Sequence, residues 1–123
     1  MKFRRVINYL LLICLAISLY SCQPKWTPED LFGEWKTVSW TINETNQEID
    51  QIMDFSFYDD KTYKVDYGTM FEEGKFWTET DYLVTVENGK HEKKVKILNI
   101  TQDSFIFQMN RSGRLEDVVL IKE

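Results

Sequence analysis

From residue 33 onward, apolar side chains recur at every second position, not at the 3.6-residue spacing of a helix. Successive side chains of a strand point to opposite faces, so this alternation predicts strands with one buried face. It is clearest in three sets of residues: Met53, Phe55 and Phe57; Tyr63, Val65 and Tyr67; and Phe105, Phe107 and Met109. β-Branched and aromatic residues, which favour strands, dominate these runs. The sequence therefore predicts an all-β domain.

Short polar segments of the kind that form turns separate the alternating runs. Asn88-Gly89 is the strongest of these signals, because both central residues of a type I′ hairpin turn need a positive φ. Strands joined by such turns are antiparallel neighbours, and closure into a barrel removes the exposed edges of the sheet. We therefore expect an eight-stranded antiparallel up-and-down meander closed into a small β-barrel. The expected strands span Glu34–Ile42, Met53–Tyr58, Thr62–Tyr67, Gly74–Glu79, Tyr82–Glu87, His91–Asn99, Ser104–Met109 and Leu115–Lys122.

One connection, from Asn43 to Ile52, is longer than the others and mostly polar. Ile49 and Ile52 are spaced for one helical turn that would cover the mouth of the barrel. A plain surface loop is the other interpretation, and it is the one that we favour.

Length and charge limit what the chain does. Its 123 residues correspond to a single domain. All 20 acidic residues follow Cys22, whereas three of the 15 basic residues precede it. The part of the chain from Cys22 onward is thus acidic, and an acidic surface repels the phosphate backbone of nucleic acids. We expect no nucleic-acid partner.

The first 21 residues have the layout of a signal peptide. Three basic residues precede a mainly apolar run from Val6 to Tyr20. This run is shorter than the ~20 apolar residues that a transmembrane helix needs. The segment Leu19-Tyr20-Ser21-Cys22 resembles the lipobox of bacterial lipoproteins.

The lipobox resemblance implies that residues 1–21 are removed and that Cys22 carries acyl chains such as palmitate. Several chains make a stable membrane anchor, whereas one binds only marginally. Cys14 lies in the removed segment, so acylation also explains the single unpaired cysteine of an exported chain. A secretory cleavage site in a freely soluble protein is the alternative. An Asp after the cysteine would signal retention in the inner membrane, and this chain has Gln23 there, which favours the outer membrane. Some surface lipoproteins carry acidic residues just after the cysteine. Gln23–Trp26 contains none, so we expect the periplasmic face.

Residues 22–30 are expected to form a short tether. Pro24 and Pro28 exclude a helix interior or a central strand. Thr27 as a cap and Pro28 at the first helical position predict a single helical turn. Leu31 and Phe32 would then plug one end of the domain.

The segment Leu31-Phe32-Gly33-Glu34-Trp35-Lys36 resembles the Gly-x-Trp signature that opens the first strand of lipocalins. Together with the lipobox and the final run Val118–Lys122, it makes residues 31–123 similar to the small lipocalin-like domains of Gram-negative bacterial lipoproteins. The resemblance implies that Gly33 allows close chain approach and that Trp35 closes the base of the barrel. It also implies a cation stacked on Trp35, for which lipocalins favour arginine and this chain offers Lys122.

A barrel of eight short strands holds either its own side chains or one small ligand. The residues that we expect to line a ligand site are Trp40, Phe55, Phe57, Tyr63, Val65, Phe105 and Phe107. The favoured hypothesis is a membrane-anchored, non-enzymatic protein that binds a small hydrophobic ligand. A solid barrel that acts as an interaction or inhibitor module for an envelope protein is the alternative.

Motifs for catalysis are scarce. His91, the one histidine, follows a hairpin turn, and the sequence contains no zinc-ligand spacing, phosphate loop or Ser/His/Asp triad. The acidic pairs Asp59-Asp60 and Glu72-Glu73 are expected to be solvated turn charges. In the basic run Lys90–Lys96, Lys94 and Lys96 alternate with Val95 and Ile97, as on the outer face of a strand, and binding of an anionic lipid head group or an acidic partner is the alternative. An envelope hydrolase acting through His91 or an acidic pair is the least favoured hypothesis. We expect no cofactor and no metal.

Overall fold

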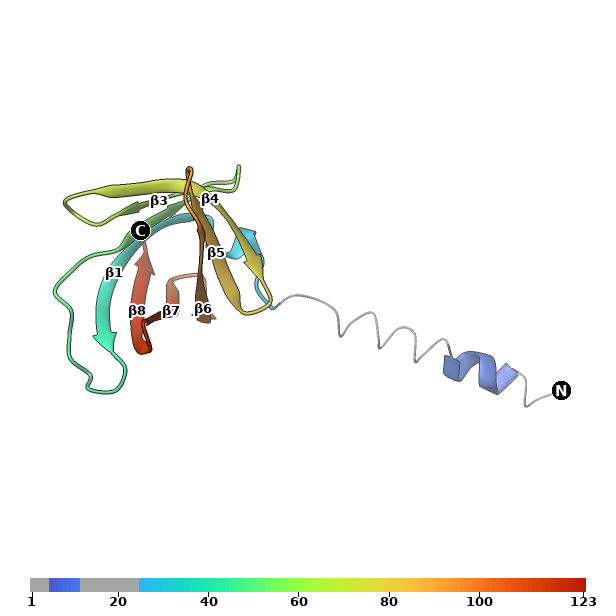
Figure 1. Ribbon diagram of the computed structural model, residues 1–123. Helices are drawn as coiled ribbons and strands as arrows, with labels where there is room; N and C mark the ends of the chain where they lie inside the picture. Colours follow the sequence, from blue (N-terminus) through green and yellow to red (C-terminus); the bar gives the residue numbers. More distant parts are fainter. Residues whose placement is uncertain (1–4, 12–24) are drawn as a thin grey trace.

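Eight antiparallel strands follow one another in chain order around a closed barrel (Figure 1). The computed structural model describes residues 5–11, which are helical, and residues 25–123, which contain the barrel. The strands are β1 (Gly33–Ile42), β2 (Asp54–Phe57), β3 (Thr62–Asp66), β4 (Phe71–Glu79), β5 (Tyr82–Glu87), β6 (Glu92–Ile100), β7 (Ser104–Arg111) and β8 (Arg114–Lys122). The predicted all-β meander and its closure into a barrel are confirmed.

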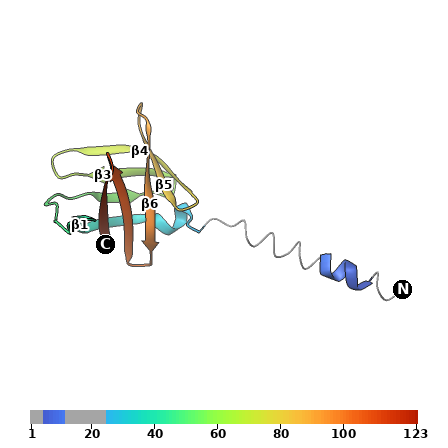
Figure 2. The ribbon, with the colours of Figure 1, turned by 60° about the horizontal axis from the view of Figure 1, so that its bottom comes forward.

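Closure depends on the pairing of the first strand with the last. β8 pairs with β1 from Trp35 opposite Lys122 to Ile42 opposite Glu116. In Figure 2, β1, β3 and β4 run across the view whereas β6 and the C-terminal strands cross them. Within residues 5–11 and 25–123, no helix has the length and apolar character needed to cross a bilayer.

Two β-bulges help the short strands to curve. The register shifts between Thr37 and Ser39 on β1 and between Ile97 and Asn99 on β6. A bulge bends its strand and increases the local twist, which helps a sheet to close. Each bulge leaves an extra apolar residue, Val38 or Leu98, exposed on the outside.

Gly74 on β4 marks a close approach between two strands. A Cβ atom at this position would lie 1.9 Å from the carbonyl oxygen of Val86 on β5. No side chain fits in that space, so glycine is required for β4 and β5 to pair as they do.

The closed end of the barrel is the end that carries the turns 58–61, 80–81 and 101–103. A single 3₁₀ turn, η1 (Pro28–Leu31), lies there, and Asp30 accepts a hydrogen bond of 2.9 Å from the backbone N–H of Thr27. Leu31 is fully buried, and its carbonyl oxygen accepts a 2.8 Å hydrogen bond from the indole of Trp35. The predicted single helical turn at Pro28 is thus confirmed, and it seals this end.

An aromatic cluster fills the closed half of the interior. Phe55 and Phe57 stack with their ring centroids 5.1 Å apart, and Phe57 meets Phe76 edge-on at 4.8 Å. Phe105 and Phe107 complete the cluster from β7. Such aromatic pairs stabilise a core beyond the burial of their area.

The opposite end, which we call the mouth, carries the connections 43–53, 67–70, 88–91 and 112–113. Residues 43–53 form turns and one isolated bridge, between Thr41 and Glu48, so this segment is the plain loop that we favoured and not a helical turn. In both Figure 1 and Figure 2 this loop lies on the left, and the blue segment that contains η1 lies on the right. The described chain therefore enters the barrel at the closed end.

Candidate functional site

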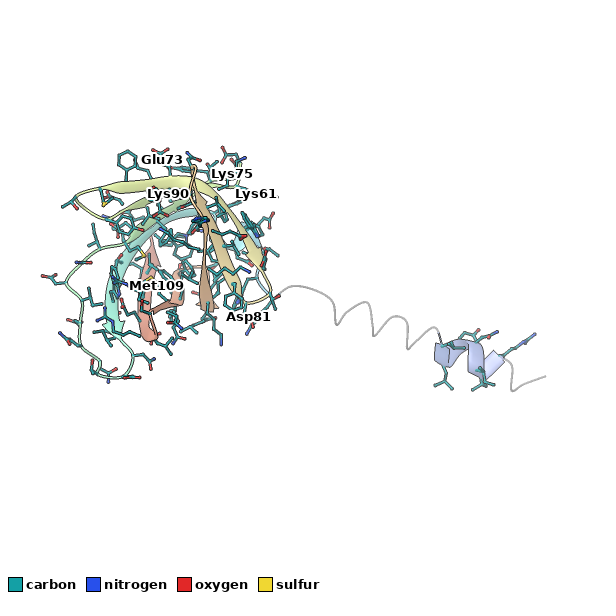
Figure 3. The ribbon with its side chains drawn as sticks, in the orientation of Figure 1. Lys61, Glu73, Lys75, Asp81, Lys90 and Met109 are labelled. Carbon is teal, nitrogen blue, oxygen red and sulfur yellow. The ribbon has the colours of Figure 1, made fainter. Side chains whose placement is uncertain are left out.

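A cavity of about 420 Å³ opens at the mouth of the barrel. Figure 3 labels Met109, on its wall, and Asp81, in the turn at the closed end. Its apolar lining consists of Trp40, Met53, Phe55, Val65, Leu83, Val95, Phe107 and Met109. Its polar lining consists of Gln51, Tyr67, Glu72, Thr85, Lys93 and Arg111.

Four of the seven residues expected to line a ligand site, Trp40, Phe55, Val65 and Phe107, do line this cavity. Phe57, Tyr63 and Phe105 differ from the expectation because they are buried below its floor, where Phe57 and Phe105 pack edge to face. Alternation selects the inward face of a strand, but it does not separate residues near the mouth from residues near the closed end.

Glu72 is the most unexpected member of the cavity wall. It was expected to be a solvated turn charge, but it is 7% exposed and points inward from β4. The hydroxyl of Tyr63 donates to its Oε2 at 2.5 Å, while the hydroxyl of Tyr67 and Nζ of Lys93 donate to its Oε1 at 3.2 and 2.9 Å. The prediction for Glu72 is therefore wrong, and three donors explain why its carboxylate is tolerated there.

The hydrogen bonds around Glu72 decide its charge. Burial raises the pKa of this carboxyl, but the hydrogen bonds from Tyr63 and Lys93 and the charge of Lys93 outweigh burial and lower the pKa. Burial and the neighbouring carboxylate raise the pKa of both Tyr63 and Tyr67, so both stay protonated as donors. At neutral pH this part of the wall is a closed network around an ionised carboxylate.

A second buried carboxylate, Glu116 on β8, lies behind the cavity wall. It has no exposed surface. Its Oε1 accepts hydrogen bonds from Trp40 Nε1 at 2.7 Å and from Arg111 Nη1 at 3.3 Å, and its Oε2 accepts from Arg114 at 2.8 and 2.9 Å. Burial raises the pKa of Glu116, but the hydrogen bonds from Trp40 and Arg114 and the two arginine charges lower it more.

The barrel wall is incomplete at the mouth between β6 and β7. The ladder between these strands begins at the pair Lys96 and Gln108 and continues toward the closed end. Nearer the mouth, β6 pairs with β5 as far as Glu92, and β7 pairs with β8 as far as Arg111. Lys93 and Arg111 both line the cavity from these two separated strand ends.

At the closed end, the three residues expected to close the barrel lie together. Gly33 has a φ of +123°, which favours glycine, and a Cβ atom there would lie 2.7 Å from Cε of Lys122. Nζ of Lys122 lies 5.1 Å from the ring centroid of Trp35. This distance is within the range of a cation–π interaction, so lysine takes the place where the resemblance favoured arginine.

The remaining candidates for chemistry do not form a site. His91 is exposed, as are Asp59, Asp60 and Glu73. Among the described residues, no group of three or more His, Cys, Asp or Glu side chains is arranged to hold a metal ion. Cys22 lies outside the described residues.

Comparisons with known proteins bear on the fold alone. No protein-family model and no curated protein matches the sequence. A crystal structure of a lipocalin-like protein from Bacteroides uniformis matches with a TM-score of 0.58 at 10% sequence identity, over 76% of this chain and 99% of that chain. The barrel has a lipocalin-like fold. The first-strand signature of Gly33 and Trp35 thus led to the right architecture.

The sequence reasoning missed Glu72, Lys93 and Arg111. Glu72 precedes Gly74 and Phe76 on the same face of β4, but the predicted strand began at Gly74. Arg111 was missed because the predicted seventh strand ended at Met109. Lys93 shares its face with Val95 and Ile97, so the alternation would have placed it inward.

Proposed function

We propose that the protein is a membrane-anchored, non-enzymatic binding protein that holds a small apolar molecule in the mouth of its lipocalin-like barrel. The cavity at the mouth carries this proposal. Its volume of about 420 Å³ lies within the ~300–1,000 Å³ of pockets that hold small molecules. Phe55, Leu83 and Phe107 supply an apolar floor, and the buried rings of Phe57, Phe76 and Phe105 below it limit the ligand to the upper half of the barrel.

We propose that acyl chains on Cys22 anchor the protein to the outer membrane on its periplasmic side. The described chain enters the barrel at the closed end, where the carbonyl oxygen of Trp26 accepts a hydrogen bond from Thr78 on β4. Gln23 and Pro24 alone separate Cys22 from Lys25, which allows a reach of roughly 10 Å. The closed end then lies near the bilayer and the mouth faces away from it, so the ligand enters from the aqueous side.

An apolar dye tests ligand binding. The mature chain carrying Cys22→Ser, exported behind a signal peptide without a lipobox, is titrated with N-phenyl-1-naphthylamine, whose fluorescence rises in an apolar site. We expect saturable binding with one dye per protein. Val95→Trp, which fills the cavity, should abolish binding, and Val38→Trp, the same change on the outer surface, should leave it intact. No saturable binding, or equal binding by both variants, would contradict the proposal.

A second candidate function is an interaction or inhibitor module for an envelope protein. Exposed apolar side chains at the mouth favour it, because Ile52 is 41% and Met70 is 65% exposed beside a shallow groove between their loops. Crosslinking from position 70 in the native envelope should then capture one partner protein reproducibly. Binding of the dye in the cavity together with no reproducible partner would reject this candidate.

A further inference from the structure

We infer that the ligand is an amphiphile with an anionic head group, which Lys93 and Arg111 bind at the gap between β6 and β7. This inference rests on the proposed function, because it concerns the chemistry of the molecule in the same cavity. The apolar tail would lie against Phe55, Leu83 and Phe107, and the head would lie at the mouth.

The hydrogen-bonding capacity of the wall points to an acceptor on the ligand. Both carboxylates are occupied, because Glu72 accepts from Tyr63, Tyr67 and Lys93 and Glu116 accepts from Trp40 and two arginines. Lys93 and Arg111, in contrast, have N–H donors that the described hydrogen bonds do not use. Among the described contacts, Lys93 uses one of three donors and Arg111 uses one of five.

The charges at the mouth point to an anion. Lys93, Arg111 and Arg114 face two carboxylates, Glu72 and Glu116, so these five side chains together carry a net charge of +1, while the nearby Glu87 pairs with Lys90. Glu116 would keep Arg114 and Trp40 if Arg111 turned toward a ligand. A carboxylate or phosphate head compensates the charge, whereas an ammonium head would be repelled by it.

The gap gives the head group a place. Continuing the β6–β7 register from Lys96 opposite Gln108 sets Lys93 opposite Arg111, at the point where the two strands no longer pair. Their side chains are 56% and 54% exposed, so water and a ligand head reach both. The head would therefore lie between two cations while the tail remains below it.

Matched ligands test the inference. Isothermal titration calorimetry measures the dissociation constants of dodecanoic acid, dodecan-1-ol and dodecylamine with the mature Cys22→Ser chain. We expect the acid to bind at least about tenfold more tightly than the alcohol, because hydrogen bonds to charged groups are the stronger ones. Arg111→Gln and Lys93→Gln should reduce this preference of the protein for the acid over the alcohol.

Two controls separate the head-group effect from general electrostatics. Lys94→Gln removes the same charge from the neighbouring residue on the outer face, where Lys94 pairs with Glu79, and should keep the full preference. Arg111→Lys retains the positive charge and should keep most of the preference for the acid. Equal binding of acid and alcohol, tighter binding of the amine, or a preference unchanged in both Gln variants would overturn the inference and leave the proposed function intact. Binding of none of the three would contradict the proposed function itself.

Discussion

The indole N–H of Trp40 on β1 donates a 2.7 Å hydrogen bond to Oε1 of Glu116 on β8, where the first and last strands close the barrel. Glu116 is fully buried and also accepts hydrogen bonds from Arg111 and Arg114. The strand that begins the domain is thus joined to the strand that ends it by a side-chain contact as well as by the backbone ladder.

Glu116→Gln is expected to lower the free energy of unfolding by about 2 kcal/mol, because a neutral amide weakens the charged hydrogen bonds and leaves two arginine charges without their partner. Urea unfolding measures the change. Glu73→Gln, an exposed carboxylate on the same barrel, serves as the control and should change stability by less than about 0.5 kcal/mol. Equal stability of the two variants would contradict a structural role for Glu116.

Stability is expected to fall on acidification. The pKa values of Glu72 and Glu116 are lowered in the folded barrel, so below the ordinary value of 4.5 the unfolded chain takes up protons that the folded chain does not. The two carboxylates make their full contribution to the free energy of unfolding above pH 4.5, and this contribution is lost as the pH falls through their folded-state pKa values. The midpoint of urea unfolding between pH 6 and pH 3 measures this. In the double variant Glu72→Gln, Glu116→Gln, the urea midpoint should depend less on pH than in the wild type. If the two curves of midpoint against pH run parallel, these carboxylates are not the cause of the acid destabilisation.

Gly74→Ala is expected to destabilise the barrel by about 3 kcal/mol, because the added Cβ atom meets the carbonyl oxygen of Val86 and forces β4 and β5 apart. The melting temperature by circular dichroism measures the loss. Lys75→Ala, at the exposed neighbouring position, should stay close to the wild type. An unchanged melting temperature for Gly74→Ala would show that the two strands are free to separate.

The fold was predictable because a small barrel obeys local rules. One buried face for each strand gives the period of two, and turn residues such as Asn88-Gly89 fix antiparallel neighbours. Pro28 likewise marked the start of η1. The bulges at Val38 and Leu98 left no comparable signal, because they depend on how the whole sheet closes.

The site was predictable in part. Alternation finds the inward residues Trp40 and Phe107, but their depth in the barrel follows from the tilt and stagger of the strands, which no local pattern contains. Glu72 was missed because its burial depends on donors from two other strands, Tyr63 on β3 and Lys93 on β6, that only the folded barrel brings together. The gap between β6 and β7 is also a long-range property.

Cys22→Ser is expected to move the protein from the membrane fraction to the soluble fraction and to abolish incorporation of a palmitate analogue. Detergent phase partitioning and metabolic labelling measure the two effects. Ser21→Thr, beside the acceptor, changes the motif without removing the thiol and should still be labelled. Labelling that persists in Cys22→Ser would contradict the anchor.

The orientation of the barrel on the membrane is testable with dyes at its two ends. With Cys22 acylated, a cysteine introduced by Asp81→Cys at the closed end or by Gln51→Cys at the mouth is the one free thiol. A dye at position 81 should be quenched more strongly than a dye at position 51 by nitroxide-labelled lipid head groups. Stronger quenching at position 51 would place the mouth against the bilayer.

Native mass spectrometry of the domain, released from its own envelope by cleavage after Lys25, tests the central claim most directly. We predict a small-molecule mass increment that is lost on collisional activation, present in the wild type and absent in Val95→Trp. A bare mass for the wild type, or the same increment in both proteins, would contradict a ligand in the cavity.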